Sequence, residues 1–135
     1  MSPEIKVAVN GALGRMGSTV LSAAAAENDV TPVGGADIAG SSDSLTIIGT
    51  SVSVPLALSL TELFAITKPD VVVDFTNGEA AKESILTCID AGVRVVSGST
   101  GLSSEDMEEI KLRSSGSGIG VISASNFALG AVVLM

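Results

Sequence analysis

Three glycines follow the first apolar segment of the sequence at intervals of three residues: Gly11, Gly14 and Gly17. Ile5–Asn10 before them alternates apolar side chains as in a strand, and apolar residues recur after them at helical spacing. A strand that enters a helix through glycines can turn tightly, approach a ligand with its backbone and pack the helix closely on the sheet. The helix N-terminus then offers free N–H groups and partial positive charge to phosphates. The pattern predicts a diphosphate-binding loop formed by Gly11, Ala12, Leu13, Gly14, Arg15, Met16 and Gly17.

An acidic residue follows at the distance expected of a ribose ligand. Asp37 lies about 20 residues after Gly17, at the end of a second predicted strand, Val30–Asp37. A carboxylate there would accept hydrogen bonds from the hydroxyls of an adenosine ribose. Glycines spaced three and three differ from the G-x-G-x-x-G fingerprint, and alone they would indicate only a strand-to-helix turn. The order strand, glycines, helix, strand and acid favours a dinucleotide site.

The residues around Asp37 favour NADH over NADPH. Ile38 follows it, and no Arg or Lys lies between Val30 and Ser53. The 2′-phosphate of NADPH would therefore meet a carboxylate, and two like charges at about 4 Å repel by about 1 to 4 kcal/mol, depending on exposure. Arg15 leaves the alternative open, because it could turn toward a 2′-phosphate or equally be a solvated cation. We predict NADH as the preferred cofactor and NADPH as the alternative.

Strands alternate with helices through the rest of the chain. The Gly- and Ser-rich segment 38–53 is predicted as a surface loop with a short strand near Ser51–Val54, and Ser59–Glu62 as a capping box that opens a short helix. Further strands are predicted over 70–76, 93–96 and 119–124, and further helices over 78–91, 103–113 and from 127 onward. This alternation requires right-handed crossovers and a parallel sheet. We predict an α/β fold with a doubly wound parallel sheet, a Rossmann-like dinucleotide-binding domain.

Three further polar segments come at the ends of predicted strands: Asp74–Thr76, Gly98–Gly101 and Ser123–Phe127. In an open parallel sheet, ligands lie outside the carboxyl ends of the strands, where the strand order reverses. Each segment alone is an ordinary loop. Together with the glycine loop, however, the three would line one crevice, and this convergence favours a binding site.

These segments resemble one enzyme family. Gly11–Gly17, Val73–Thr76, Gly98–Gly101 and Ser125–Gly130 are similar, in order and spacing, to the 4-hydroxy-tetrahydrodipicolinate (dihydrodipicolinate) reductases of lysine and diaminopimelate biosynthesis. The resemblance covers essentially the whole chain, and its G-R-M-G and S-N-F-x-L-G segments are the most specific. It implies hydride transfer from NADH or NADPH to a heterocyclic dicarboxylate, with loss of water, by a homotetramer.

The resemblance also implies roles for individual residues. It places the glycine loop at the pyrophosphate and Asp37 at the adenosine ribose. It places Gly98 and Thr100 in a loop whose backbone meets the nicotinamide and whose threonine contacts a substrate carboxylate; Ser99 stands where the family has Thr and keeps the hydroxyl. The segment 125–127 corresponds to the one at the nicotinamide carboxamide. Beyond the glycine loop, the predicted cofactor contacts are Asp37, Phe75, Thr76, Gly98, Ser99, Thr100, Ser125, Asn126 and Phe127.

The sequence contains no histidine. The family's general acid and substrate-anchoring basic residues belong to an H-H-x-x-K-type motif in a later part of the enzyme, so no catalytic residue is assigned in this chain. We expect residues 1–127 to form the NAD(P)-binding domain and 128–135 to begin the helix toward a second domain, absent here, that binds substrate and builds the tetramer. The chain alone is expected to bind dinucleotide and to turn over poorly or not at all.

Charge and composition narrow the partners. The seven basic residues are scattered singly among 15 acidic ones, for a net charge of −8, whereas nucleic acid requires a basic stripe. No apolar run approaches the ~20 residues of a membrane span, and the N-terminus does not resemble a signal peptide. We expect a cytoplasmic protein with a small-molecule substrate, no metal, and no nucleic-acid or membrane partner. Cys88, the one cysteine, shares an apolar helix face and is expected to be a buried structural thiol.

Two other functions and several residue roles stay open. The chain could be a non-catalytic nucleotide- or redox-sensing module, or a CoA-binding Rossmann-like domain, although Asp37 would repel the 3′-phosphate of CoA. Phe75 fits a core residue and a residue flanking the cofactor equally well. Asp74 either orders the nicotinamide ribose or merely ends its strand, and we favour a role near the site. Met16 is predicted to pack beneath the glycine loop.

Overall fold

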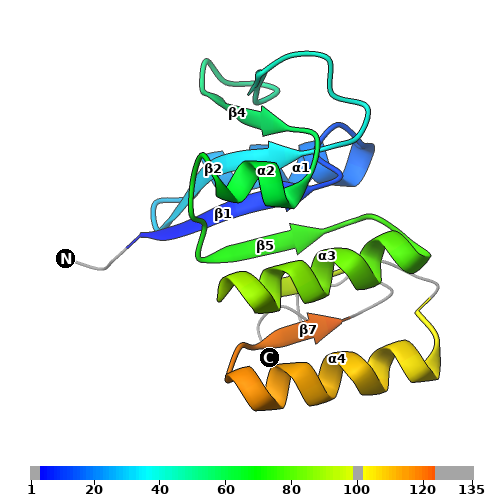
Figure 1. The fold of residues 1–135 in the computed structure, drawn as a ribbon. Helices are drawn as coiled ribbons and strands as arrows, with labels where there is room; N and C mark the ends of the chain where they lie inside the picture. Colours follow the sequence, from blue (N-terminus) through cyan, green and yellow to red (C-terminus); the bar gives the residue numbers. More distant parts are fainter. Residues whose placement is uncertain (1–3, 99–101, 124–135) are drawn as a thin grey trace.

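The computed structural model describes residues 4–98 and 102–123, which form one sheet covered by helices (Figure 1). Within them the sheet has seven strands in the order β3-β4-β2-β1-β5-β6-β7. The strands are β1 (Ile5–Asn10), β2 (Val30–Ala36), β3 (Ser44–Thr46), β4 (Ser53–Ala57), β5 (Val71–Asp74), β6 (Arg94–Ser97) and β7 (Val121–Ser123). The helices are α1 (Arg15–Ala25), α2 (Leu60–Phe64), α3 (Gly78–Ala91) and α4 (Ser104–Ser117).

All strand pairs are parallel except the antiparallel pair of β3 with β4. From β1 the chain builds β2 and β4 on one side and then β5, β6 and β7 on the other. The strand order therefore reverses at β1, between β2 and β5, which is where ligands of such sheets bind. The predicted doubly wound α/β fold is confirmed.

Each face of the sheet packs against its own apolar cluster, as the aliphatic strands require. Helices α2, α3 and α4 cover one face, where Leu63, Ile85 and Ile110 are buried with Ala8 of β1. Helix α1 covers the opposite face, where Leu21 is buried with strand and loop residues (Figure 1). Neighbouring residues of a strand point to opposite faces. Asn10 is the last residue of β1 and is in register with Asp74, the last residue of β5. Both therefore lie at the carboxyl edge of the sheet, between the two packed layers.

The segment 38–53, predicted as a loop with a strand near Ser51–Val54, contains more structure than expected. β4 begins at Ser53 and runs to Ala57, and β3 pairs with it antiparallel, Leu45 opposite Val54. Ile47 between the two strands is 2% exposed. The apolar side chains in this Gly- and Ser-rich segment therefore anchor it to the α1 face of the sheet.

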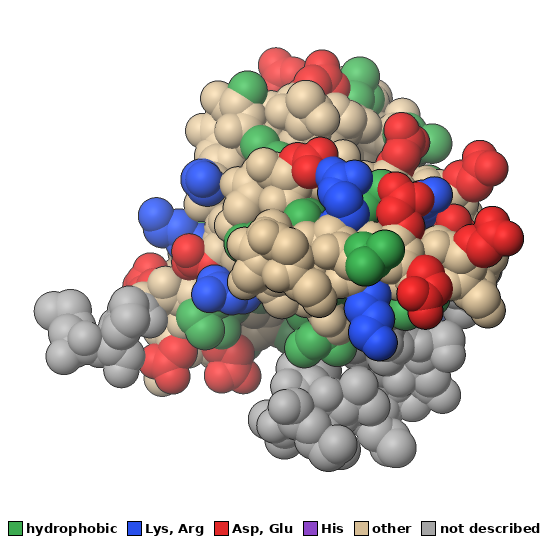
Figure 2. Space-filling model, turned by 60° about the horizontal axis from the view of Figure 1, so that its bottom comes forward, with side chains coloured by type: hydrophobic (Ala, Val, Ile, Leu, Met, Phe, Trp, Pro, Cys, Tyr) green, Lys and Arg blue, Asp and Glu red, His purple; other side chains and the backbone are tan. Residues whose placement is uncertain are grey.

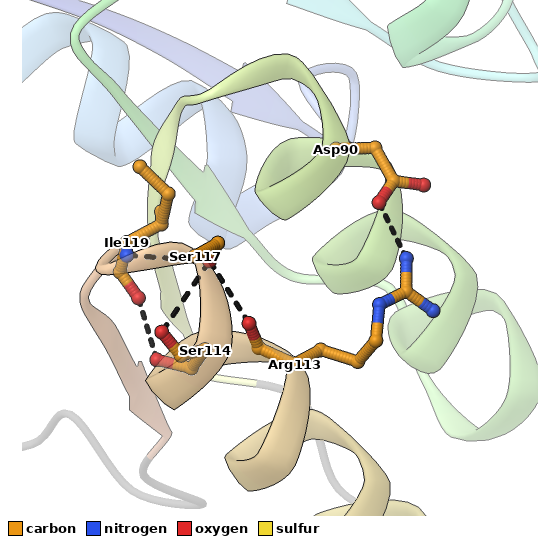
Figure 3. A network of polar contacts seen from close by, with 5 residues as sticks. All are labelled: Asp90, Arg113, Ser114, Ser117 and Ile119. Atoms are coloured by element: carbon orange, nitrogen blue, oxygen red, sulfur yellow. Dashed lines mark hydrogen bonds and ion pairs between the residues drawn. The ribbon is translucent and has the colours of Figure 1, made fainter.

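Two glycines end the long helices. Gly92 adopts a left-handed φ of 76° and stops α3 at the predicted residue, and Gly118 (φ 75°) does the same for α4. The helix predicted over 103–113 is therefore too short, because α4 continues to Ser117. Figure 3 shows one reason: the Ser117 hydroxyl donates to the Arg113 carbonyl within the last helical turn, and the Arg113 side chain pairs with Asp90 of α3.

The short helix α2 starts at the predicted cap. The Ser59 hydroxyl accepts from Glu62 N at 3.2 Å and lies 3.4 Å from the Glu62 carboxylate, and the helix stops at Phe64. Leu63 then fills the space above β2, where a Cβ on Gly34 would lie 2.8 Å from Leu63 Cδ1. The absence of a side chain at Gly34 thus allows α2 to sit directly on the sheet.

Candidate functional site

The glycine loop has the steric properties that its spacing predicts. Gly11 has φ +85°, and the amides of Gly11 and Ala12 both donate to the Ala36 carbonyl of β2, at 2.8 and 3.1 Å. A Cβ on Gly17 would lie 2.2 Å from the Gly11 carbonyl oxygen, so only glycine lets α1 approach this closely. Gly14 is the N-cap of α1 and, in the described residues, no side chain caps this helix. The first amides of α1 thus remain available to an anion at the carboxyl edge.

Asp37 lies near the glycine loop and also forms a hydrogen bond with it. Its carboxylate accepts from Leu13 N and from Ala39 N, both at 2.9 Å. Asp37 is half-buried, so its remaining acceptor capacity faces a ligand at the same edge. The sequence predicted a ribose ligand at this position, but the bond to Leu13, which couples the acid to the shape of the glycine loop, was not foreseen.

A cavity of about 550 Å³ lies at this carboxyl edge, and we call it the edge cavity. It brings together five of the predicted site residues, which come from the ends of β1, β2 and β5 and from the start of α1: Gly11, Gly14, Asp37, Phe75 and Thr76. Its volume falls in the range of small-molecule and cofactor sites. The glycine loop and Asp37 therefore meet the first of the three predicted polar segments at one cavity.

Other predicted site residues lie away from the cavity. Ala12 and Gly17 are buried behind the loop, and Leu13, Arg15 and Met16 are exposed. Met16 is 47% exposed, so the prediction that it packs beneath the loop is wrong; it lies in the first turn of α1, whose packed positions are Gly17, Leu21 and Ala24. Gly98 is half-buried and does not line the cavity. The remaining predicted contacts lie outside the described residues: Ser99, Thr100, Ser125, Asn126 and Phe127.

One wall of the edge cavity was missed. It comes from the start of α2, including Leu60 and Thr61, and from one face of α3, where Ala80, Ser84 and Thr87 line the cavity. Small and hydroxyl-bearing residues at i, i+4 and i+7 share a helix face, and this spacing was the available signal. The Asn10 side chain, at the end of β1, lies at the base of this wall next to Ser84.

Asp74 lies beneath the cavity and is fully buried. Its carboxylate accepts from Asn10 Nδ2 at 3.0 Å, from Thr76 Oγ1 at 2.8 Å and from Ser97 Oγ at 3.3 Å. It does not line the edge cavity itself, but it bonds Asn10 and Thr76, which do, so it lies near the site as favoured from the sequence. Asp74 ties together the ends of β1, β5 and β6. Phe75, left open between a core and a cofactor role, packs against the α1-side cluster and also lines the cavity.

Cys88 is fully buried in α3, as predicted. Burial, with a smaller contribution from the Asp74 charge, raises the pKa of Cys88 to about 12. The thiol therefore stays protonated at neutral pH and has no nucleophilic character there. Among the described residues, no group of three or more His, Cys, Asp or Glu side chains is placed to hold a metal ion.

The acidic start of α4 makes bonds within the protein. Ser103 and Asp106 form a reciprocal capping box, and Lys82 of α3 pairs with Asp106 at 3.3 Å and Glu109 at 2.9 Å. Figure 2, which brings the α4 side forward, shows basic side chains lying apart from one another among acidic ones. No helix in residues 4–98 or 102–123 has the length and apolar character that a membrane span needs.

The family model for the N-terminus of dihydrodipicolinate reductase matches residues 5–127. The chain belongs to this family. Over 135 residues it is 42% identical to the 4-hydroxy-tetrahydrodipicolinate reductase of Dehalococcoides mccartyi, covering 100% of this chain and 51% of that protein. Over 136 residues it is 40% identical to the enzyme of the same name from Methanothermobacter thermautotrophicus, covering 93% and 49%. The chain thus spans about half the length of the curated relatives it matches.

Solved structures show the same fold. A dipicolinate-bound dihydrodipicolinate reductase from Paenisporosarcina sp. TG-14 superposes with a TM-score of 0.81 and 30% identity, over 97% of this chain and 51% of that one. GenD2 from gentamicin A biosynthesis, solved with NAD, has a TM-score of 0.73 at 21% identity, over 94% and 36%. The second likeness shows only that this domain has the fold of NAD-binding dehydrogenases.

Proposed function

We propose that this chain is the dinucleotide-binding half of a reductase that uses NADH to reduce 4-hydroxy-tetrahydrodipicolinate in lysine and diaminopimelate biosynthesis. The observation that carries this proposal is the edge cavity, where the glycine loop and Asp37 converge in a chain of the dihydrodipicolinate reductase family. The relatives carry the reductase name, and the cytoplasmic setting and homotetramer expected from the resemblance are proposed with it.

The residues present suit a dinucleotide. The uncapped amides at the start of α1 offer N–H donors to a diphosphate, and Gly11 and Gly14 let it approach because they carry no side chains. The close fit of Gly17 to Gly11 holds the loop in place. Asp37 accepts from ribose hydroxyls while its bond to Leu13 keeps the loop shaped for the diphosphate. The bound dinucleotide would supply the hydride, and the role of this chain is to bind and orient the dinucleotide.

Asp37 also carries the proposed preference for NADH. A 2′-phosphate on the adenosine ribose would lie against this carboxylate, and the neighbouring Ile38 is 91% exposed and has no charge to offset the repulsion. Arg15, an exposed cation at the first residue of α1, is the group that would have to turn to accept NADPH. We therefore place NADPH second.

The nicotinamide end of the site is proposed from the family pattern. Gly98, Ser99 and the segment 125–127 are assigned to the nicotinamide, and Thr100 to a substrate carboxylate. The family's acid and substrate-anchoring residues belong to its second domain, so we propose residues 1–127 as the cofactor domain and 128–135 as the start of the connection to that domain.

Calorimetric titration of the chain with NADH, NADPH and CoA tests the cofactor assignment. We expect NADH to bind most tightly, NADPH more weakly and CoA most weakly, because both competitors carry a ribose phosphate that Asp37 repels. Tightest binding of CoA would overturn the proposal, as would no binding of either nicotinamide dinucleotide.

A chimera tests the reaction. It joins this chain at Met135 to the remaining half of the Dehalococcoides mccartyi relative, which aligns over the full chain. We expect NADH oxidation that depends on 4-hydroxy-tetrahydrodipicolinate, with the relative itself as control. A chimera that folds and binds NADH but leaves this substrate unreduced, under conditions where the relative is active, would contradict the proposal.

A further inference from the structure

Asn10, the last residue of β1, is 9% exposed and lines the edge cavity. Its amide nitrogen donates to Asp74 Oδ1 at 3.0 Å and to Ser84 Oγ at 2.6 Å. An asparagine NH₂ group has two hydrogens, so both are engaged with residues beneath and beside the cavity. The side chain is thereby fixed between β5 and α3.

Both neighbours fix which end of the amide faces them. The Asp74 carboxylate accepts hydrogen bonds, here also from the Thr76 hydroxyl at 2.8 Å. Ser84 donates its hydroxyl hydrogen to the Ala80 carbonyl at 2.8 Å, so toward Asn10 it accepts. Turning the amide over would set oxygen against oxygen at both contacts. The nitrogen is therefore held toward Asp74 and Ser84.

The carbonyl oxygen of Asn10, Oδ1, remains as an acceptor. It accepts no hydrogen bond from any residue that the structure describes. Every sealed side-chain nitrogen or oxygen in the described part of the chain has a partner, so this oxygen is accessible, and the cavity is the open space that Asn10 lines. A ligand that displaces water there leaves the acceptor unsatisfied unless the ligand brings a donor.

We propose that Asn10 is a specificity residue that reads the exocyclic amine of adenine through Oδ1. The inference rests on the proposed function. Asp37 faces the ribose, and the wall above Asn10 offers apolar Leu60 and Ala80 to a flat base. An amine that donates matches an acceptor of fixed orientation, whereas a base with a carbonyl at that position would place oxygen against oxygen.

Calorimetry with reduced nicotinamide hypoxanthine dinucleotide, which carries an oxygen in place of this amine, tests the proposal beside NADH. The wild-type chain should bind NADH about three- to tenfold more tightly, the value of one neutral hydrogen bond. Asn10→Ser keeps a donor for Asp74 but withdraws the carbonyl, and should bind both dinucleotides alike. Ser97→Ala, which removes a different hydrogen bond from Asp74, should keep the wild-type ratio.

Asp74→Asn provides a second variant should Asn10→Ser fail to fold. It keeps the shape of Asp74 but can donate, so only Ser84 still fixes the orientation of the Asn10 amide, and the preference for NADH should narrow. A wild-type chain that binds the two dinucleotides equally overturns the inference, as does a variant that loses affinity equally for both. Failure of the wild-type chain to bind either dinucleotide would instead refute the proposed function.

Discussion

The two walls of the edge cavity are built in different ways. On the α1 side the wall is backbone, because Gly11 and Gly14, with Gly17 behind them, present no side chains. On the α3 side it is made of side chains, and the polar ones form a hydrogen-bonded wall in which Asp74 holds Asn10 and Asn10 donates to Ser84. The backbone wall depends on the absence of Cβ atoms, which is an all-or-none steric condition. The polar wall depends on hydrogen bonds between distant residues, whose loss has graded effects.

The largest effect is expected at Gly17. In Gly17→Ala the new Cβ would lie 2.2 Å from the Gly11 carbonyl oxygen and 2.9 Å from its carbon, and both are backbone atoms that cannot rotate away. We expect a loss of about 3 kcal/mol in the free energy of unfolding, and loss of NADH binding as the loop is displaced. Urea denaturation and calorimetry measure the two effects.

Gly116→Ala is the matched control. Gly116 also lies in a helix, but a Cβ at this position would meet no other atom within 4 Å. Its substitution should leave stability unchanged or raise it by up to about 1 kcal/mol. Equal stability of Gly17→Ala and the wild type would show that the backbone wall is more yielding than its geometry indicates.

The same contrast explains what the sequence could reveal. The glycine loop, the parallel sheet and the end of α3 at Gly92 follow from local steric rules, and each was predicted. The Asn10–Ser84 contact joins residues 74 positions apart and depends on strand register, which no local pattern contains. The extension of α4 through Ser117 was also missed, because serines and a glycine are typical of turns, whereas here the Ser117 hydroxyl bonds within the last helical turn (Figure 3).

Asp37 combines features of both walls, because it is a side chain that hydrogen-bonds the backbone of the glycine loop. Its removal should weaken the binding of NADH. Asp37→Ala removes the bonds to Leu13 N and Ala39 N and the proposed ribose ligand. We expect NADH binding to weaken by about 10- to 100-fold, the value of hydrogen bonds to a charged group, and the preference for NADH over NADPH to narrow. Asp43→Ala removes an exposed acid that does not line the edge cavity and should change neither. An unchanged ratio of the two affinities in Asp37→Ala would separate this residue from cofactor choice.

Cys88 lies in the core, near the charge of Asp74. Burial and, to a smaller extent, the Asp74 charge raise its pKa from 9.0 to about 12. Below pH 9 the thiol is protonated in both states. Above it the unfolded chain loses the proton first, so stability falls by about 1.4 kcal/mol per pH unit until the folded thiol titrates. The difference in unfolding free energy between wild type and Cys88→Ala should therefore shift against the wild type by about 1.4 kcal/mol from pH 8 to pH 10. A constant difference would contradict the raised pKa.

The smallest effect is expected on the outer face of α3, away from the cavity. Lys82 pairs there with Asp106 and Glu109, which raise its pKa through hydrogen bonds, but these exposed charges are screened by water and salt. Lys82→Met should lower the thermal midpoint by no more than about 2 °C, because Asp106 keeps its capping box with Ser103.

Arg113→Met removes the other ion pair between α3 and α4 and serves as the matched variant (Figure 3). Both losses should vanish in 0.5 M salt (about a 4–5 Å screening length), and neither variant should alter the affinity for NADH. A large loss of NADH affinity in Lys82→Met alone would mean that contacts on the outer face of α3 change the position of its cavity-lining face. The two faces of α3 could then not be divided into a structural one and a ligand-binding one, because a helix that shifts as one body carries Ser84 with it.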